Sequence, residues 1–112
     1  RTNAEDPYKF TPSPGRITAW HAPGGPGVRV DSHAYTNYFV PPNYDSMIGK
    51  IIVHGDTRDQ ALARMRTALS ETVVEGIHTN IPLHRELMVD AKFIEGGTSI
   101  HYLEGWLGQH KR

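Results

Sequence analysis

The sequence predicts an α+β domain, in which an antiparallel β-sheet is followed by flanking C-terminal helices. Residues 1–56 hold short apolar stretches separated by Gly and Pro, as strands and turns do. Residues 57–112 hold apolar side chains at three- and four-residue spacing, which is typical of helices. The length of 112 residues suits one domain and is sufficient for a hydrophobic core.

Strands are expected in the first half wherever apolar and β-branched residues alternate or cluster. The strongest pattern is Ile48–His54, which Gly55 and Asp56 close. Residues 22–27 contain two Pro and three Gly, so we expect a loop between strands there. The predicted strands are residues 17–21, 28–31, 35–40 and 48–54.

The first helix is expected to begin at Thr57, because Thr57 and Gln60 have the spacing of a capping box. Gly76 stands where a left-handed residue would end that helix. Between them an apolar stripe recurs with helical spacing. The stripe consists of Ala61, Leu62, Met65, Ala68, Leu69, Thr72 and Val73.

Two shorter helices are expected after it. One begins at Asn80 as its cap, has Pro82 in its first turn and ends near Val89. The other spans about residues 100–107, after the flexible turn of residues 96–99. That turn precedes a helix, so its N–H groups are placed to face an anion, although capping alone explains them.

Composition excludes several classes. Twelve Lys and Arg balance twelve Asp and Glu, which argues against a nucleic-acid partner. The absence of Cys excludes disulfides and thiolate metal sites, and is compatible with a reducing compartment. No run of about 18 apolar residues is present, so we expect no membrane partner.

Local motifs leave no complete active site. The seven histidines lack the i, i+4 spacing of a helical zinc site, so no metal ligand is predicted in the chain. Glu5 and Asp6 are read as a turn rather than a catalytic carboxylate pair. Asp45 similarly suits a turn, or orients a partner group. The glycine-rich segment after His21 lacks the Lys-Ser/Thr ending and the helix that phosphate binding needs.

Seven motifs occur in order along essentially the whole chain: RTNAEDP, FTPSPG-I, HAPGG-GVR-DSH-Y, VPP-YDSMIGK, R--A--RM--AL, GI-TN---H and F--GGTSIHYLE. Together they resemble the C-terminal domain of biotin carboxylase, the ATP-grasp component of bacterial acetyl-CoA carboxylase. The resemblance implies that residues 1–112 are one domain of a longer enzyme and that the chain begins inside a strand.

The resemblance also implies an activity and its cofactors. The family joins ATP and bicarbonate with Mg²⁺ or Mn²⁺, and carboxylates biotin on biotin carboxyl carrier protein. This is the first half-reaction of acetyl-CoA carboxylase in fatty acid synthesis. The implied partners are that carrier, the carboxyltransferase subunits and a second copy in a homodimer, and the implied location is the cytoplasm. The isolated chain is expected to be inactive, because metal ligands, general base and phosphate-binding lysines lie upstream.

Five residues receive roles from the resemblance. Arg1 matches the catalytic arginine that approaches the ureido oxygen of biotin, where a guanidinium stabilises negative charge. Ile100 matches a residue near the adenine of ATP, and His101 lies beside it. Arg29 falls in a segment used at the homodimer interface, near which Asp45 would give structural support.

The chain departs from the family at two positions, and alternatives remain. Thr2 replaces the usual aliphatic residue after the arginine, and Pro26 stands where several relatives have a bulky aromatic. Pyruvate carboxylase and the propionyl- and methylcrotonyl-type acyl-CoA carboxylases share this domain. A non-catalytic, stand-alone interaction module is the alternative outside enzymology.

Overall fold

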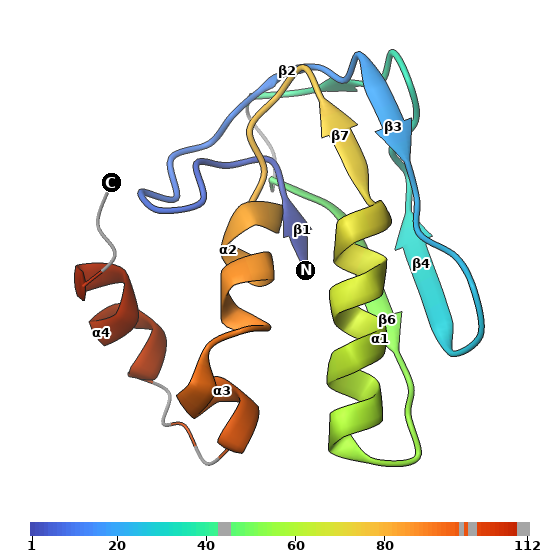
Figure 1. The fold of residues 1–112 in the computed structure, drawn as a ribbon. Coiled ribbons are helices and arrows are strands. Elements are labelled where there is room, and N and C mark those ends of the chain that lie inside the picture. The colour runs from blue at the N-terminus through green and yellow to red at the C-terminus, as the bar shows by residue number, and fades with distance from the viewer. Residues whose placement is uncertain (43–45, 97, 99–100, 110–112) are drawn as a thin grey trace.

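The computed structural model describes residues 1–42, 46–96, 98 and 101–109, and its secondary structure confirms the α+β class (Figure 1). The strands are β1 (Thr2–Asn3), β2 (Gly15–Arg16), β3 (Ala19–His21), β4 (Val28–Ser32), β5 (Phe39–Val40), β6 (Met47–Val53) and β7 (Val73–Glu75). The helices are α1 (Arg58–Glu71), α2 (Ile81–Leu87), α3 (Ala91–Glu95) and α4 (Tyr102–Gln109).

The strands form separate small sheets in the described residues, not the single sheet that the sequence predicts. The largest has the order β1-β6-β4, while β2 pairs with β5 and β3 pairs with β7. Every pairing is antiparallel. The long strand β6 is therefore the centre to which the two-residue strand β1 attaches, with Thr2 opposite Gly49.

Two predicted strands are shorter than expected because the chain turns inside them. Ile17 lies outside β3, and its N–H donates to the carbonyl of Tyr38 at 2.9 Å. In the predicted strand 35–40, Asn37 has a φ of 74°, which is left-handed backbone. Only Phe39–Val40 remains extended and paired.

The first helix ends earlier than the sequence predicts, and the assignment of Gly76 as its C-cap is wrong. One half of the predicted capping box is confirmed, since the side chain of Thr57 accepts from the N–H of Gln60 at 3.2 Å. The other half differs, because Oε1 of Gln60 accepts from the N–H of Asp56, at 2.6 Å, and not from that of Thr57. Helix α1 ends at Glu71, and Val73–Glu75 pairs with β3. Three consecutive β-branched residues favour this strand, although two of them fit the helical stripe.

The later helices are shifted or added. Helix α2 follows Asn80 as predicted and ends at Leu87. Helix α3 was not predicted, because it is only five residues long. Helix α4 begins at Tyr102 and ends at Gln109, two residues later at each end than expected. None of the helices in the described ranges is long and apolar enough to cross a membrane.

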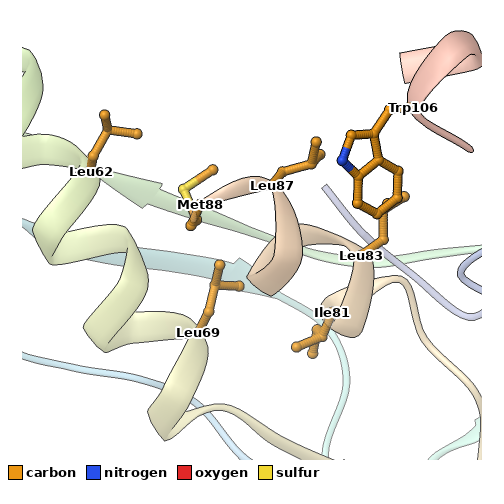
Figure 2. Close-up of a cluster of buried hydrophobic side chains, with 7 residues drawn as sticks. All are labelled: Leu62, Leu69, Ile81, Leu83, Leu87, Met88 and Trp106. Atoms are coloured by element: carbon orange, nitrogen blue, oxygen red, sulfur yellow. The ribbon is translucent and has the colours of Figure 1, made fainter. Parts of the chain in front are cut away.

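Two hydrophobic clusters hold these elements together. In the larger one, side chains of α2 lie between those of α1 and Trp106 of α4 (Figure 2). Its buried members are Leu62, Leu69, Ile81, Leu83, Leu87, Met88 and Trp106. The smaller cluster contains Ala4, Ile17, Val40 and Ile48. Strand β1 therefore leads directly into one core and lies beside α2 (Figure 1).

Candidate functional site

Strand β1 places Arg1 at the edge of the larger sheet. Thr2 is 3 % exposed and pairs with β6, while Ala4 is buried in the smaller cluster. The N–H of Ala4 donates to the carbonyl of Ser46 at 2.7 Å. The backbone that follows Arg1 is thus fixed by a sheet and by core packing.

Asn80 fixes the opposite edge of β1. Its Oδ1 accepts from the N–H of Asn3 at 2.9 Å, and its Nδ2 donates to the carbonyl of Arg1 at 3.0 Å. Its own N–H donates to the carbonyl of Asn3 at 3.2 Å. The predicted capping residue therefore begins α2 without a side-chain cap, because its amide is bonded to β1.

His84 contacts the same carbonyl from one turn further along α2. Its Nε2 lies 2.8 Å from the carbonyl oxygen of Arg1, 83 residues away in sequence. A carbonyl oxygen only accepts, so Nε2 must carry the hydrogen. Burial lowers the pKa of His84 below its usual range, against the opposing effect of this hydrogen bond. The ring is therefore neutral at pH 7 and bonded through the Nε2–H tautomer.

The guanidinium of Arg1 forms no hydrogen bond or ion pair with any residue that the structure describes, and Arg1 is exposed. Beside it lies a pocket of about 80 Å³ whose remaining lining is largely apolar. The pocket is lined by Arg1, Thr2, Ile51, Met65, Leu69, His84 and Met88. An anchored backbone thus carries a cation that is available to a ligand.

The second predicted site lies at the start of α4. Ile100 falls outside the described residues, so its predicted contact with adenine stays a prediction. His101 directly precedes α4, and its Nδ1 lies 3.7 Å from Oε2 of Glu104. Both side chains are strongly exposed, at 75 % and 79 %, so this pair contributes little to stability.

Asp90 joins α3 to α4 behind His101. Its Oδ1 accepts from the N–H of Phe93 at 3.0 Å and from the hydroxyl of Tyr102. Its Oδ2 accepts from Nε1 of Trp106 at 3.1 Å. The Tyr102 hydroxyl, followed by the Phe93 N–H, lowers the pKa of Asp90, while Asp90 raises the pKa of Tyr102 to about 12.

Arg1 and His101 line different pockets. His101 belongs to one of about 380 Å³, formed by residues of the α3–α4 region. That pocket is lined by Asp90, Ala91, Lys92, His101, Tyr102, Gly105, Trp106 and Gln109. The two predicted site residues are therefore presented by separate parts of the fold and do not form one pocket within it.

The remaining predicted residues lie elsewhere. Arg29 is on β4, an edge strand, and its Nη2 lies 3.2 Å from Oδ2 of Asp31. Pro26 is exposed in the loop between β3 and β4, which confirms the predicted strand-to-strand loop. Asp45 lies outside the described residues.

The turn at Asp6 is confirmed. Its Oδ1 accepts from the N–H groups of Tyr8 and Lys9, at 2.9 and 2.8 Å, and these bonds lower the pKa of Asp6. Across the described ranges, no group of three or more His, Asp or Glu side chains is arranged to hold a metal ion.

Sequence reasoning missed the hydrogen bonds that Asn80 and His84 donate to the carbonyl of Arg1. Asn80 was assigned only a cap, and His84 was counted among locally satisfied histidines. The motif GI-TN---H contains both residues, and their i, i+4 spacing puts them on one helix face. That spacing was the available signal, but it does not identify a strand 79 residues upstream as the partner.

Comparison with known proteins gives one consistent result. Residues 1–105 match the family described as the biotin carboxylase C-terminal domain. The chain is 61 % identical over 111 residues to the biotin carboxylase of Pseudomonas aeruginosa, covering 99 % of this chain and 25 % of that protein.

Solved structures agree. The biotin carboxylase subunit of a pyruvate carboxylase has a TM-score of 0.94 and 41 % identity, covering 100 % of this chain and 25 % of that one. The biotin carboxylase domain dimer of the Hydrogenobacter thermophilus 2-oxoglutarate carboxylase, solved with ADP, magnesium and bicarbonate, has a TM-score of 0.91 and 42 % identity. It covers 94 % of this chain and 23 % of that one. The chain spans about a quarter of these relatives, and it belongs to the biotin carboxylase C-terminal domain family.

Proposed function

We propose that residues 1–112 form the C-terminal domain of a biotin carboxylase and contribute Arg1 to its active site. The enzyme would use ATP and bicarbonate to carboxylate biotin on biotin carboxyl carrier protein, as the first half-reaction of acetyl-CoA carboxylase in fatty acid synthesis. The observation that carries this proposal is an exposed guanidinium on an anchored strand, at the position that matches the family's arginine.

The chemistry suits an arginine. Removing the N1′ proton of biotin places negative charge on the ureido oxygen. A guanidinium remains charged throughout the working pH range and donates in fixed directions, so it stabilises that charge when its own position is fixed. The anchoring of β1 supports this role, because donors that are already oriented need no rearrangement as charge develops.

The described residues supply only part of such a site. They contain no arrangement of His, Asp and Glu that fits Mg²⁺ or Mn²⁺, so we assign the metal and the ATP phosphates to parts of the enzyme outside this chain. His101 is exposed beside its own pocket, which supports a contact with the nucleotide base. Because these groups are bound outside it, the isolated chain is inactive.

Assembly is also part of the proposal. Arg29 lies exposed on the edge strand β4, which supports its assignment to a homodimer contact. The carrier protein and the carboxyltransferase subunits would be the further partners, and the enzyme would work in the cytoplasm. Pyruvate carboxylase is a second candidate source, because the biotin carboxylase subunit of such an enzyme superposes closely on this chain.

The test is Arg1→Ala in the complete enzyme. We expect kcat for biotin carboxylation to fall about 100- to 1,000-fold, as for the loss of an oxyanion donor, while the Kd for ATP is unchanged. Arg16→Ala, which removes an exposed arginine on β2, is the matched control and should leave both values unchanged. Equal losses of carboxylation and ATP affinity in Arg1→Ala would contradict the assignment.

Two further measurements separate the alternatives. The intact mass of the native protein distinguishes an enzyme domain, with a mass several-fold above 12.5 kDa, from a stand-alone module. Carboxylation assays of the complete protein with acetyl-CoA, pyruvate, propionyl-CoA and methylcrotonyl-CoA as final acceptors then distinguish the acetyl-CoA carboxylase from the related carboxylases.

A further inference from the structure

The carbonyl oxygen of Arg1 is bonded more fully than a strand end requires. It accepts from Nδ2 of Asn80 at 3.0 Å and from Nε2 of His84 at 2.8 Å. A carbonyl oxygen has two lone pairs, so these donors occupy both. The orientation of the peptide group that follows Arg1 is therefore set by two side chains, besides the pairing of Thr2 with β6.

Helix geometry explains why both donors reach one atom. Asn80 and His84 lie one turn apart on α2, and the N–H of His84 donates to the carbonyl of Asn80 at 3.1 Å. Neighbouring core residues Ile81 and Leu83 are each 3 % exposed, so the helix cannot shift without disturbing the core. The two donors are thus presented by a rigid element.

We infer that Asn80 and His84 are positioning residues, which hold the backbone of Arg1 so that its guanidinium is oriented towards the ureido oxygen. This inference rests on the proposed function of Arg1. Neither residue touches the substrate in this scheme. Each acts through the Arg1 carbonyl, two bonds from the Cα atom that carries the catalytic side chain.

The burial of Asn80 and His84 supports their role as positioning residues. Asn80 is 6 % exposed, and burial keeps His84 neutral at pH 7. Buried polar groups are costly unless bonded, and the Arg1 carbonyl satisfies a donor of each side chain. A small displacement of a catalytic group costs rate rather than stability, and a 1 Å error can cost about 100-fold.

The experiment uses the complete enzyme with three variants. His84→Leu keeps bulk and removes the donor, while His84→Gln keeps an N–H donor. Asn80→Asp keeps the acceptor for the Asn3 N–H but removes the donor to Arg1. His54→Leu, at an exposed histidine after β6, is the matched control. The readouts are kcat and KM for biotin, KM for ATP, and bicarbonate-dependent ATP cleavage without biotin.

We expect His84→Leu and Asn80→Asp to lower kcat for carboxyl transfer about 10- to 100-fold, with KM for ATP and ATP cleavage unchanged. His84→Gln should recover most of the rate. The decisive measurement is the double variant Arg1→Ala/His84→Leu, which should be no slower than Arg1→Ala alone, because a positioning residue has no effect once its target is removed.

Other outcomes overturn the inference. Losses that multiply in the double variant, or ATP cleavage that falls in parallel, would assign His84 a general structural role. Should His84→Leu fail to fold, the comparison of Asn80→Asp with Arg1→Ala decides, and an Asn80→Asp enzyme of normal rate refutes positioning. A normal rate in Arg1→Ala would instead reject the proposed function itself. A normal rate in His84→Leu alone would reject only the positioning role.

Discussion

The two parts of the domain that carry predicted site residues are held in different ways. Arg1 is fixed by side chains 79 and 83 residues away in sequence. The α3–α4 region before and after His101 is joined by Asp90, whose partners Tyr102 and Trp106 are 12 and 16 residues away. The hydrogen bonds at Arg1 thus depend on the completed fold, whereas those at Asp90 are local. The second region meets the rest of the domain through Trp106, which packs in the larger cluster, and through the bonds from Arg58 to the carbonyls of Phe93 and Ile94.

This difference predicts that each region can be disrupted without the other. A change that loosens α2 against α1 should move the Arg1 backbone, because α2 carries both of its donors. A change that detaches α4 should affect His101 and leave β1 in place. Of the residues described in these two helices, none in α3 and only Trp106 in α4 is buried. Elements with few buried residues open at lower free energy than the core, so the α3–α4 region should be the first to open.

The largest effect is expected in the first region, from Leu69→Ala. Leu69 is 2 % exposed on α1 and packs in the larger cluster with α2, so its removal leaves a cavity. We expect a loss of about 3 kcal/mol in the free energy of unfolding. Leu103→Ala on α4, where the side chain is half-buried, should cost about 1 kcal/mol. Urea unfolding of the 112-residue chain measures both, and equal losses would contradict the comparison.

A smaller and local effect is expected from Asp90→Ala, which removes two hydrogen bonds to α4 and the side-chain bond that caps α3. Trp106 fluorescence in a Trp20→Phe background should report an exposed indole, while global unfolding is little changed. Asp59→Ala, an acidic residue in the first turn of α1, is the matched control. A cooperative loss of the whole fold in Asp90→Ala would show that the regions are not separable.

The same carboxylate gives this region a pH dependence. The folded-state pKa of Asp90 is lowered, chiefly by the Tyr102 hydroxyl, so its stabilisation is present above the unfolded value and is lost as pH falls through the folded value. The raised pKa of Tyr102, about 12, means that its contribution is present below 10.0 and is lost as pH rises through about 12. In the Trp20→Phe background, Trp106 fluorescence should therefore report an exposed indole as pH falls below the unfolded value of 3.8, and Asp90→Ala should lack that transition.

The sequence predicted what depends on local chemistry and on family resemblance. The cap at Thr57, the turn at Asp6 and the loop after β3 were correct, because each depends on a few neighbouring residues. The predicted end of the first helix at Gly76 was wrong. Thr72 and Val73 fit a helical stripe and a strand equally well, and the pairing of Val73–Glu75 with β3 decided between the two. Local propensity is weaker than such tertiary pairing.

The candidate site was likewise predicted only in part. Arg1 was found through resemblance alone, since a single arginine carries no pattern. Asn80 was assigned correctly as a helix start, but its bond to β1 is a contact across 79 residues that no local rule contains. The sequence shows which residues share a helix face, and only the fold shows what that face meets.

The smallest effect is expected from His101→Ala, on the surface of the second region. Its Nδ1 is 3.7 Å from Glu104, and both side chains are at least 75 % exposed, so the unfolding free energy should change by less than about 0.5 kcal/mol. Urea unfolding of the chain measures this, and a loss near that of Leu69→Ala would assign His101 a folding role. In the complete enzyme the same variant should raise KM for ATP. If the free energy of unfolding does not change and KM for ATP rises, the exposed side chain of His101 serves ligand binding and not folding of the domain.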